Sequence, residues 1–130
     1  MEIQTKIEDN TLYVKAMGPF TLETSKQTFA QLIEEVIEHR IGKVLFDGRS
    51  VTRELTTMDR YEYGEFCAEQ ILKLASYHSL SPMFAYVLME PVLDPGHFGE
   101  TVAVNRGMRV KAFNNLSDAR SWLEKDNIQR

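Results

Sequence analysis

Hydrophobic positions along this chain repeat first with a period of two and then with a period close to 3.6. Residues 2–17 alternate apolar and polar side chains in two short runs around Asp9-Asn10, which predicts a β-hairpin. Residues 22–37 and 57–77 repeat their apolar positions every three or four residues, which is typical of helices that bury one face. Further strands are predicted at residues 44–46, 83–89 and 108–113, and a closing helix around residues 116–123.

The expected order of elements is two strands, three helix–strand units and a final helix. Helices that join successive strands require parallel connections, so we expect a mixed five-stranded sheet that contains one antiparallel hairpin. Thr21 is expected to cap the first helix and Gly42 to end it. Asp94 and Pro95 are expected to open a short helix that Gly107 ends. The predicted fold class is therefore α/β, with helices flanking a central sheet.

Composition and charge favour some classes of protein and argue against others. The chain is 43% hydrophobic and 26% charged with a net charge of −4, which favours one soluble domain over residues 1–130. Acids and bases are interleaved, so there is no concentrated basic face and nucleic-acid binding is not expected. The longest apolar run, residues 83–89, is too short for a membrane span. Because the first residues lack a secretion signal and Cys67 is the single cysteine, we expect a cytoplasmic protein.

Charged side chains gather after the strand predicted at residues 44–46. In open α/β sheets the carboxyl ends of strands usually meet ligands and partners, and here a charged loop is expected to lead into the second long helix. Thr56 and Asp59 have the spacing of a capping box. The arginines could form an anion pocket at the helix N-terminus, or nearby acids could neutralise them in a structural network. The candidate binding residues here are Asp47, Arg49, Arg53, Thr57, Asp59 and Arg60.

The second long helix supplies further candidates. The stripe expected to face the sheet comprises Tyr61, Gly64, Cys67, Ala68, Ile71, Leu74 and Ala75. Tyr63 and Phe66 lie beside that stripe, and an exposed apolar pair there would mark a surface for a partner or for a second copy of the chain. Cys67 is expected to pack as a small hydrophobic residue, because a reactive thiolate needs an exposed, electropositive setting.

One histidine is a candidate binding residue. His97 follows residues 94–96 in a turn predicted at the mouth of the sheet. The three histidines of the chain have no metal-ligand spacing, and no glycine-rich phosphate loop is present. We therefore expect neither a metal nor a cofactor.

Three patches of sequence carry a family resemblance. They are Phe46-Asp47-Gly48-Arg49, then Thr57-Met58-Asp59-Arg60-Tyr61 with Gly64, and finally residues 99–107 together with Ala119, Trp122 and Leu123 of the closing helix. With these patches the whole chain resembles the STAS-related SpoIIAA-like family of small bacterial proteins. The resemblance implies a mixed sheet flanked by helices, a relation to domains that bind regulatory partners, and a more distant relation to CRAL-TRIO lipid carriers.

The chain departs from the wider STAS group at one motif. Anti-sigma-factor antagonists of that group carry an Asp-Ser-Ser-Gly type motif whose serine is phosphorylated. The corresponding stretch here reads Thr56-Thr57-Met58-Asp59. Capping of the helix accounts for this stretch, although a phosphate on either threonine would also be tolerated at a helix N-terminus. The resemblance therefore does not extend to a serine switch.

These observations lead us to expect a non-enzymatic binding or regulatory domain. It would recognise a protein partner or an anionic group where the third strand meets the second long helix. A carrier of a small apolar or lipid-like ligand is the alternative, and it requires a cavity of roughly 300 Å³ or more. A small hydrolase or lyase is a further alternative, which requires Asp47, Arg49 and His97 to converge on one cleft.

Overall fold

The computed structural model of the chain describes residues 1–52, 56–90, 92–93 and 97–128. In this part of the chain the elements follow the predicted order: β1 (Glu2–Glu8), β2 (Thr11–Gly18), α1 (Leu22–His39), β3 (Lys43–Val51), α2 (Thr57–His78), β4 (Met83–Val87), α3 (Phe98–Asn105), β5 (Arg109–Phe113) and α4 (Leu116–Ile128). None of the described helices is both long enough and apolar enough to cross a membrane.

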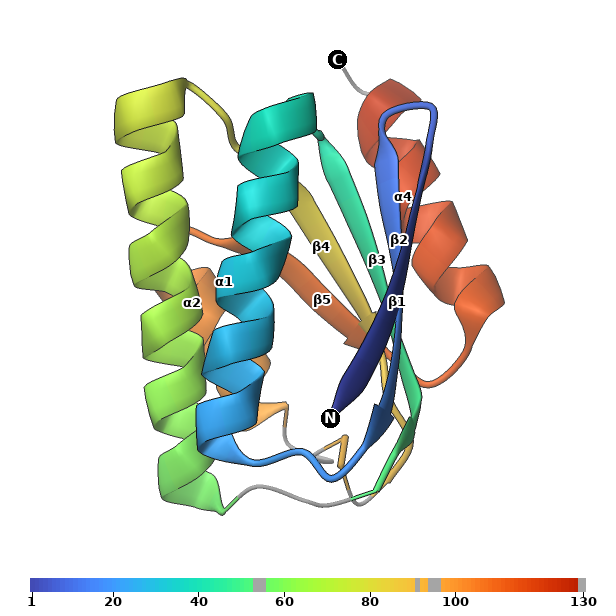
Figure 1. The fold of residues 1–130 in the computed structure, drawn as a ribbon, viewed down its shortest axis with the longest axis vertical. Helices are drawn as coiled ribbons and strands as arrows, with labels where there is room; N and C mark the ends of the chain where they lie inside the picture. Colours follow the sequence, from blue (N-terminus) through green and yellow to red (C-terminus); the bar gives the residue numbers. More distant parts are fainter. Residues whose placement is uncertain (53–55, 91, 94–96, 129–130) are drawn as a thin grey trace.

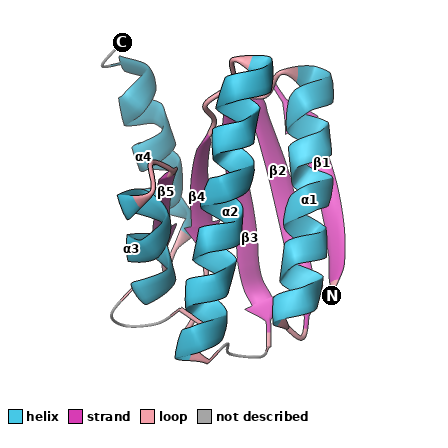
Figure 2. Ribbon diagram, turned by 90° about the vertical axis from the view of Figure 1, so that its left-hand side faces the viewer, coloured by secondary structure: helices cyan, strands magenta, loops and turns pink. Residues whose placement is uncertain are grey.

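The strands form one sheet in the order β1-β2-β3-β4-β5. The β1–β2 pair is antiparallel, and the three other pairs are parallel. Because each parallel connection steps to the next strand in the same direction and such connections are right-handed, their helices α1, α2 and α3 lie on the same face. Figures 1 and 2 show this row of three helices, with α4 on the opposite face. The predicted mixed α/β sheet is confirmed.

Two hydrophobic clusters hold these layers together. The larger one lies between the sheet and the row of three helices, and the smaller one lies under α4. Strand β4 contributes to both, since all five of its residues are buried. Strand β1 is mostly exposed. The most deeply buried large side chains of the core are Phe29, Phe46, Phe84, Leu12, Leu32 and Ile41.

The hairpin turn also fixes the start of the third strand. Asp9 adopts a left-handed backbone conformation (φ 56°) in the turn. The Oδ1 atom of Asn10 accepts a hydrogen bond of 2.9 Å from the Gly42 backbone N–H, and the Asn10 carbonyl oxygen accepts one from Lys43. The turn residues therefore join two parts of the chain that are 32 positions apart.

The end of α1 differs from the prediction. Thr21 caps the helix start as expected, with its side chain accepting from the Thr24 N–H. The left-handed residue that ends the helix is Arg40 (φ 49°), whereas Gly42 was expected to provide the stop. Arg40 tolerates this conformation because its backbone N–H bonds back to carbonyl oxygens of the last turn.

The third strand is longer than its apolar core suggests. Asp47 and Arg49, expected in a loop, lie inside the nine-residue strand β3. The parallel pairing with β2 continues past an irregularity, from Lys15 opposite Asp47 to Met17 opposite Ser50. Backbone pairing of this kind does not depend on side-chain polarity, so the hydrophobic pattern alone ends the strand too early.

Helix α2 has the predicted extent, but its buried residues do not follow the single predicted stripe. Its residues Gly64, Cys67, Ala68, Ile71 and Leu74 are buried as expected, whereas Ala75 is exposed and Tyr61 is half-buried. The helix lies between α1 and α3, so neighbouring helices cover its flanks (Figure 2).

The expectation that Tyr63 and Phe66 form an exposed pair is wrong. Both are partly buried and pack against the core. The Phe29 ring from α1 makes edge contacts with both rings, at centroid distances of 6.3 Å. The pair therefore belongs to the α1–α2 contact and does not offer a docking surface.

Helix α3 begins later than predicted. Asp94 and Pro95, the expected opening residues, lie outside the described residues. The helix begins at Phe98, with His97 at the N-cap in a left-handed conformation (φ 51°) and without a side-chain capping bond. Gly107, with φ 95°, follows the end of the helix as predicted.

We expect Gly48→Ala to destabilise the fold by about 1–3 kcal/mol, because an added methyl group would overpack the site. A Cβ atom at Gly48 would lie 2.6 Å from Leu88 Cδ2, 3.1 Å from the Phe46 ring and 3.3 Å from the Val87 carbonyl oxygen. Urea denaturation should show the lower free energy of unfolding. The matched control is Ser50→Ala, an exposed position of the same strand, which should stay within about 0.5 kcal/mol of the parent. Equal stability of all three proteins would contradict the tight approach at Gly48.

Candidate functional site

A pocket opens at the edge of the sheet where the parallel strands end. It has a volume of about 100 Å³ and lies between the N-terminal half of α2, helix α3, the end of β4 and residues along β5. Its walls are mainly apolar and include Phe20, Leu88, Val92, Leu93, Met108 and Val110. This is the position at which open α/β sheets commonly hold their ligands.

The buried part of the pocket contains two hydroxyl groups and one thiol. The hydroxyl oxygens of Tyr63 and Tyr86 are 2.9 Å apart, and Cys67, one helical turn after Tyr63, lines the same pocket. Burial raises the pKa of all three groups well above their ordinary values. All three therefore keep their protons at neutral pH, and Cys67 has no thiolate character, which agrees with its predicted packing role.

The half-exposed part of the pocket carries charged and titratable groups. The Arg60 guanidinium donates a hydrogen bond of 3.4 Å to the Val92 carbonyl oxygen, which joins α2 to the segment after β4. His97 Nδ1 lies 3.4 Å from Glu100 Oε2. The other carboxylate oxygen of Glu100 accepts a hydrogen bond from the Ala112 backbone N–H on strand β5.

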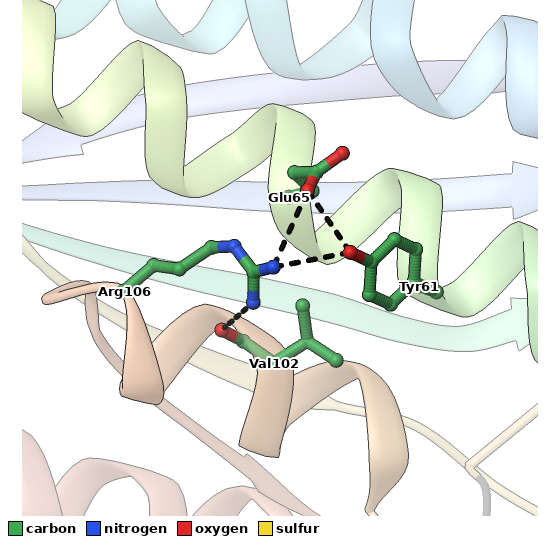
Figure 3. Close-up of polar contacts among 4 residues, drawn as sticks. All are labelled: Tyr61, Glu65, Val102 and Arg106. Atoms are coloured by element: carbon green, nitrogen blue, oxygen red, sulfur yellow. Dashed lines mark hydrogen bonds and ion pairs between the residues drawn. The ribbon is translucent and has the colours of Figure 1, made fainter.

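A second cluster joins α2 to the end of α3 beside this pocket (Figure 3). One terminal nitrogen of Arg106 donates to the Tyr61 hydroxyl (3.2 Å) and to Glu65 Oε2 (3.3 Å). The other terminal nitrogen donates to the Val102 carbonyl oxygen, and the guanidinium carbon lies 5.4 Å from the centre of the Tyr61 ring. Arg106 therefore holds α3 against α2. It belongs to residues 99–107, which carry part of the sequence resemblance, and its role there is structural.

The first turn of α2 is capped as predicted. The Asp59 N–H donates to Thr56 Oγ1 at 3.0 Å, and Asp59 Oδ2 accepts from the Thr56 N–H at 3.4 Å. Thr57 and Met58 on the same turn are exposed, and Met58 exposes 64% of its surface. The capping carboxylate already occupies part of the positive helix end, which leaves less of it for an external anion.

Asp47 and Arg49 form a separate ion pair on β3. The Arg49 Nε and Nη2 atoms each donate a 2.9 Å hydrogen bond to one carboxylate oxygen of Asp47. These bonds hold the pKa of Asp47 below its ordinary value of 3.8. Asp47 lines a second depression, on the face of the sheet that carries α4, together with Tyr13, Lys15 and Arg120.

The predicted binding residues thus lie at two separate places in the structure. Arg60, Tyr63 and His97 line one pocket, whereas Asp47 lines another. In the part of the chain that the structure describes, Asp47 and His97 therefore line different depressions, contrary to what the hydrolase or lyase alternative requires. Arg53 lies outside the described residues.

Several residues of the pocket were not among the predicted binding residues. Tyr86, Glu100 and Met108 line it but come from β4, α3 and the segment before β5. Only their positions near strand ends and a helix start could have pointed to them.

Neither depression matches a lipid carrier. The apolar pocket, at about 100 Å³, falls below the roughly 300–1,000 Å³ typical of ligand pockets. The second depression, at about 280 Å³, is lined largely by polar and charged side chains. The CRAL-TRIO relation therefore gains no support from the described residues.

One group of side chains has the geometry to approach a metal ion. Among the described residues, ligand atoms of Glu35, Glu38 and His39 all lie within 4.8 Å of one another at the end of α1. A histidine near two carboxylates at a helix C-terminus is also explained by favourable interactions with the helix dipole and with neighbouring acids. We assign no metal to this exposed group.

Comparison with known proteins identifies the fold. No family model matches the chain, and no curated protein matches its sequence. The anti-sigma factor antagonist SpoIIAA in its unphosphorylated form superposes with a TM-score of 0.59 and 6% identity, covering 95% of this chain and 97% of that chain. The NMR structure of the protein TM1081 superposes with a TM-score of 0.54 and 13% identity, covering 96% of this chain and 90% of the other.

A third solved structure belongs to the DUF3478 family with a SpoIIAA-like fold, from Shewanella loihica PV-4. It has 19% identity and a TM-score of 0.49, and the alignment covers 94% of this chain and 92% of that one. The first two comparisons show that this chain has the fold of SpoIIAA, as the sequence resemblance implies.

We expect the ion pair on β3 to make stability depend on acid pH. Because folding lowers the pKa of Asp47, its stabilising effect is fully present above the ordinary value of 3.8 and is lost as pH falls through the lower folded pKa. The difference in unfolding free energy between the parent protein and Asp47→Asn should therefore shrink between pH 6 and about pH 2. Urea denaturation across this range provides the measurement.

The partner substitution supplies the control. Arg49→Gln removes the same hydrogen bonds from the other side, so its stability difference from the parent should shrink over the same pH range. A difference for Asp47→Asn that stays constant with pH would show that the ion pair does not stabilise the fold.

Proposed function

We propose that this protein is a regulatory binding domain that recognises a protein partner through the first turn of α2. The observation that carries the proposal is the exposure of Met58 beside Thr57 on a helix start that the Thr56–Asp59 capping box holds in place. An exposed large apolar side chain on a fixed backbone is suited to protein recognition, because little conformational entropy is lost on binding.

The fold supports a binding role by analogy. SpoIIAA, which shares the fold, is by its name an antagonist of an anti-sigma factor and therefore acts on another protein. Fold alone does not carry a function from one protein to another. The analogy therefore supports the class of function, while the identity of the partner depends on the surface of this chain.

A protein partner fits the surface better than a free anion does. Asp47 neutralises Arg49, and the Asp59 carboxylate occupies the first turn of α2. Arg60 donates to the Val92 carbonyl oxygen at the pocket. Among the residues that the structure describes, the charges expected to attract an anion are thus engaged within the fold, which leaves the mixed surface around Thr57 and Met58 for contact.

Affinity capture from a lysate of the source cells tests the proposal, with Met58→Glu compared with Leu72→Glu. Both residues are exposed on α2, at 64% and 57%, and lie about 21 Å apart along the helix. Glutamate is a good helix former, so both variants should keep the melting temperature of the parent. Met58→Glu should lose the captured partner, because it places a charge in the contact, and Leu72→Glu should retain it.

Two results would contradict the proposal. One is capture of the same partner by the parent and by Met58→Glu in equal amounts. The other is loss of the partner only in Leu72→Glu, which would move the contact to the middle of the helix. A partner that proves to be a second copy of this chain would be recognised by its mass.

A further inference from the structure

Strand β1 forms an exposed end of the sheet. It comes first in the strand order, pairs with β2 along its whole length, and makes its main contacts with β2 alone among the described elements. Figure 2 shows it at the end of the sheet, beyond β2. Six of its seven residues are exposed, and Ile7 exposes 38% of its surface. A strand in this position presents backbone N–H and C=O groups that can pair with another strand.

The register shows which backbone groups of β1 point away from the sheet. A two-residue turn joins β1 to β2, and the pair that closes such a turn, Glu8 and Thr11, is hydrogen-bonded. The carbonyl oxygens of Asn10 and Gly18, both even-numbered, accept bonds from residues at the two ends of β3, so the odd positions of β2 face β1. The even positions of β1 therefore bond to β2. The outward N–H and C=O groups of β1 belong to Ile3, Thr5 and Ile7.

The side chains of β1 complement themselves in one antiparallel register. When two copies of the strand run antiparallel with Gln4 facing Gln4, Glu2 of each copy lies opposite Lys6 of the other. Opposite charges at facing positions stabilise an antiparallel pair. The same register places Ile3 opposite Thr5, so the outward backbone groups of the two copies also face one another.

Charge repulsion disfavours the adjacent registers. A pairing centred on Thr5 places Glu2 opposite Glu8, and a pairing centred on Lys6 places two lysines opposite each other. Like charges at facing positions destabilise a strand pair. Pairings centred nearer to either end of β1 bring fewer residues together. The register centred on Gln4 is therefore the longest one without repulsion between facing charges.

Lys6 selects this register. A lysine on an edge strand usually discourages pairing with other strands. Within one copy, Lys6 Nζ lies 2.8 Å from Glu8 Oε2, and the two side chains are 70% and 56% exposed. Exposed ion pairs of this kind contribute little, so Lys6 can turn toward a facing Glu2 at small cost. A strand without an acid at the matching position would leave the lysine unpaired.

We propose that two copies of this chain associate through β1, antiparallel and about a two-fold axis at Gln4, so that their sheets become one continuous sheet. The backbone groups of Ile3 and Thr5 supply the hydrogen bonds, and the two contacts between Glu2 and Lys6 fix the register. Such an interface is self-complementary, as two-fold symmetry requires. It rests on different residues from the proposed partner surface on the first turn of α2, so either proposal can fail without the other.

Sedimentation velocity of the full chain at increasing concentration tests the association. The parent protein should form a dimer, and Lys6→Glu should weaken it by about tenfold or more, because each attractive contact becomes repulsive. Adding Glu2→Lys to Lys6→Glu exchanges the two charges and should restore the dimer. Lys73→Glu makes the same change of charge at an exposed position of α2 and should leave the dimer intact.

Two sedimentation results would overturn the proposal. One is a parent protein that stays monomeric up to about 1 mM. The other is a dimer that Lys6→Glu does not weaken. Because β1 is exposed, these variants should keep the melting temperature of the parent, and loss of the dimer then reports on the interface.

Disulfide cross-linking tests the register directly. Facing Gln4 residues would form a pair without mutual backbone bonds, with Cα atoms about 4.5 Å apart, which is within reach of a disulfide. Gln4→Cys should therefore give a covalent dimer under mild oxidation on a non-reducing gel. The control is Glu8→Cys, since the two Glu8 positions would lie roughly 27 Å apart and should not cross-link. The native Cys67 is only 3% exposed and does not compete.

The two cysteine variants give opposite results only in the proposed register. Failure of Gln4→Cys to cross-link, or equal cross-linking of Glu8→Cys, would refute it.

Discussion

The handedness of the three parallel connections is the constraint on which the rest of this structure depends. Because the strands follow one another in sequence across the sheet, right-handed connections place α1, α2 and α3 on one face. Helix α2 then packs its buried residues with those of the sheet in one core cluster and has a helix on either side. This position explains why Tyr63 and Phe66 pack against Phe29, and why the pocket lies between α2 and α3 at the end of the strands.

Local signals made most of the fold predictable from the sequence. Apolar periodicity gave the elements, and the caps at Thr21 and Thr56 gave two helix starts. The predictions were wrong where a contact distant in sequence decides the outcome. Asp47 and Arg49 belong to β3 because β2 pairs with that segment, and a single helical stripe does not describe a helix with neighbours on both flanks. Arg40 ends α1 in a conformation usually taken by glycine, which no sequence pattern marks.

The candidate site was only partly predictable, for a related reason. Arg60, Tyr63 and His97 stood out by residue type and do line one pocket. Tyr86 resembled any core residue of a buried strand, and its hydroxyl contact with Tyr63 spans 23 positions of sequence. At 6% identity to SpoIIAA, the chain has a similar fold, and a shared fold does not fix the residues that determine binding.

The two edges of the sheet are not equivalent. On β5, the outward Ala112 N–H is occupied by the Glu100 carboxylate, whereas β1 forms the opposite edge and is mostly exposed. Indefinite stacking of sheets edge to edge needs two open edges on every molecule. With the Ala112 donor already engaged on β5, the exposed strand β1 is the more open of the two edges. The Glu100 carboxylate therefore competes with any neighbouring strand for the Ala112 donor, which disfavours edge-to-edge stacking through β5.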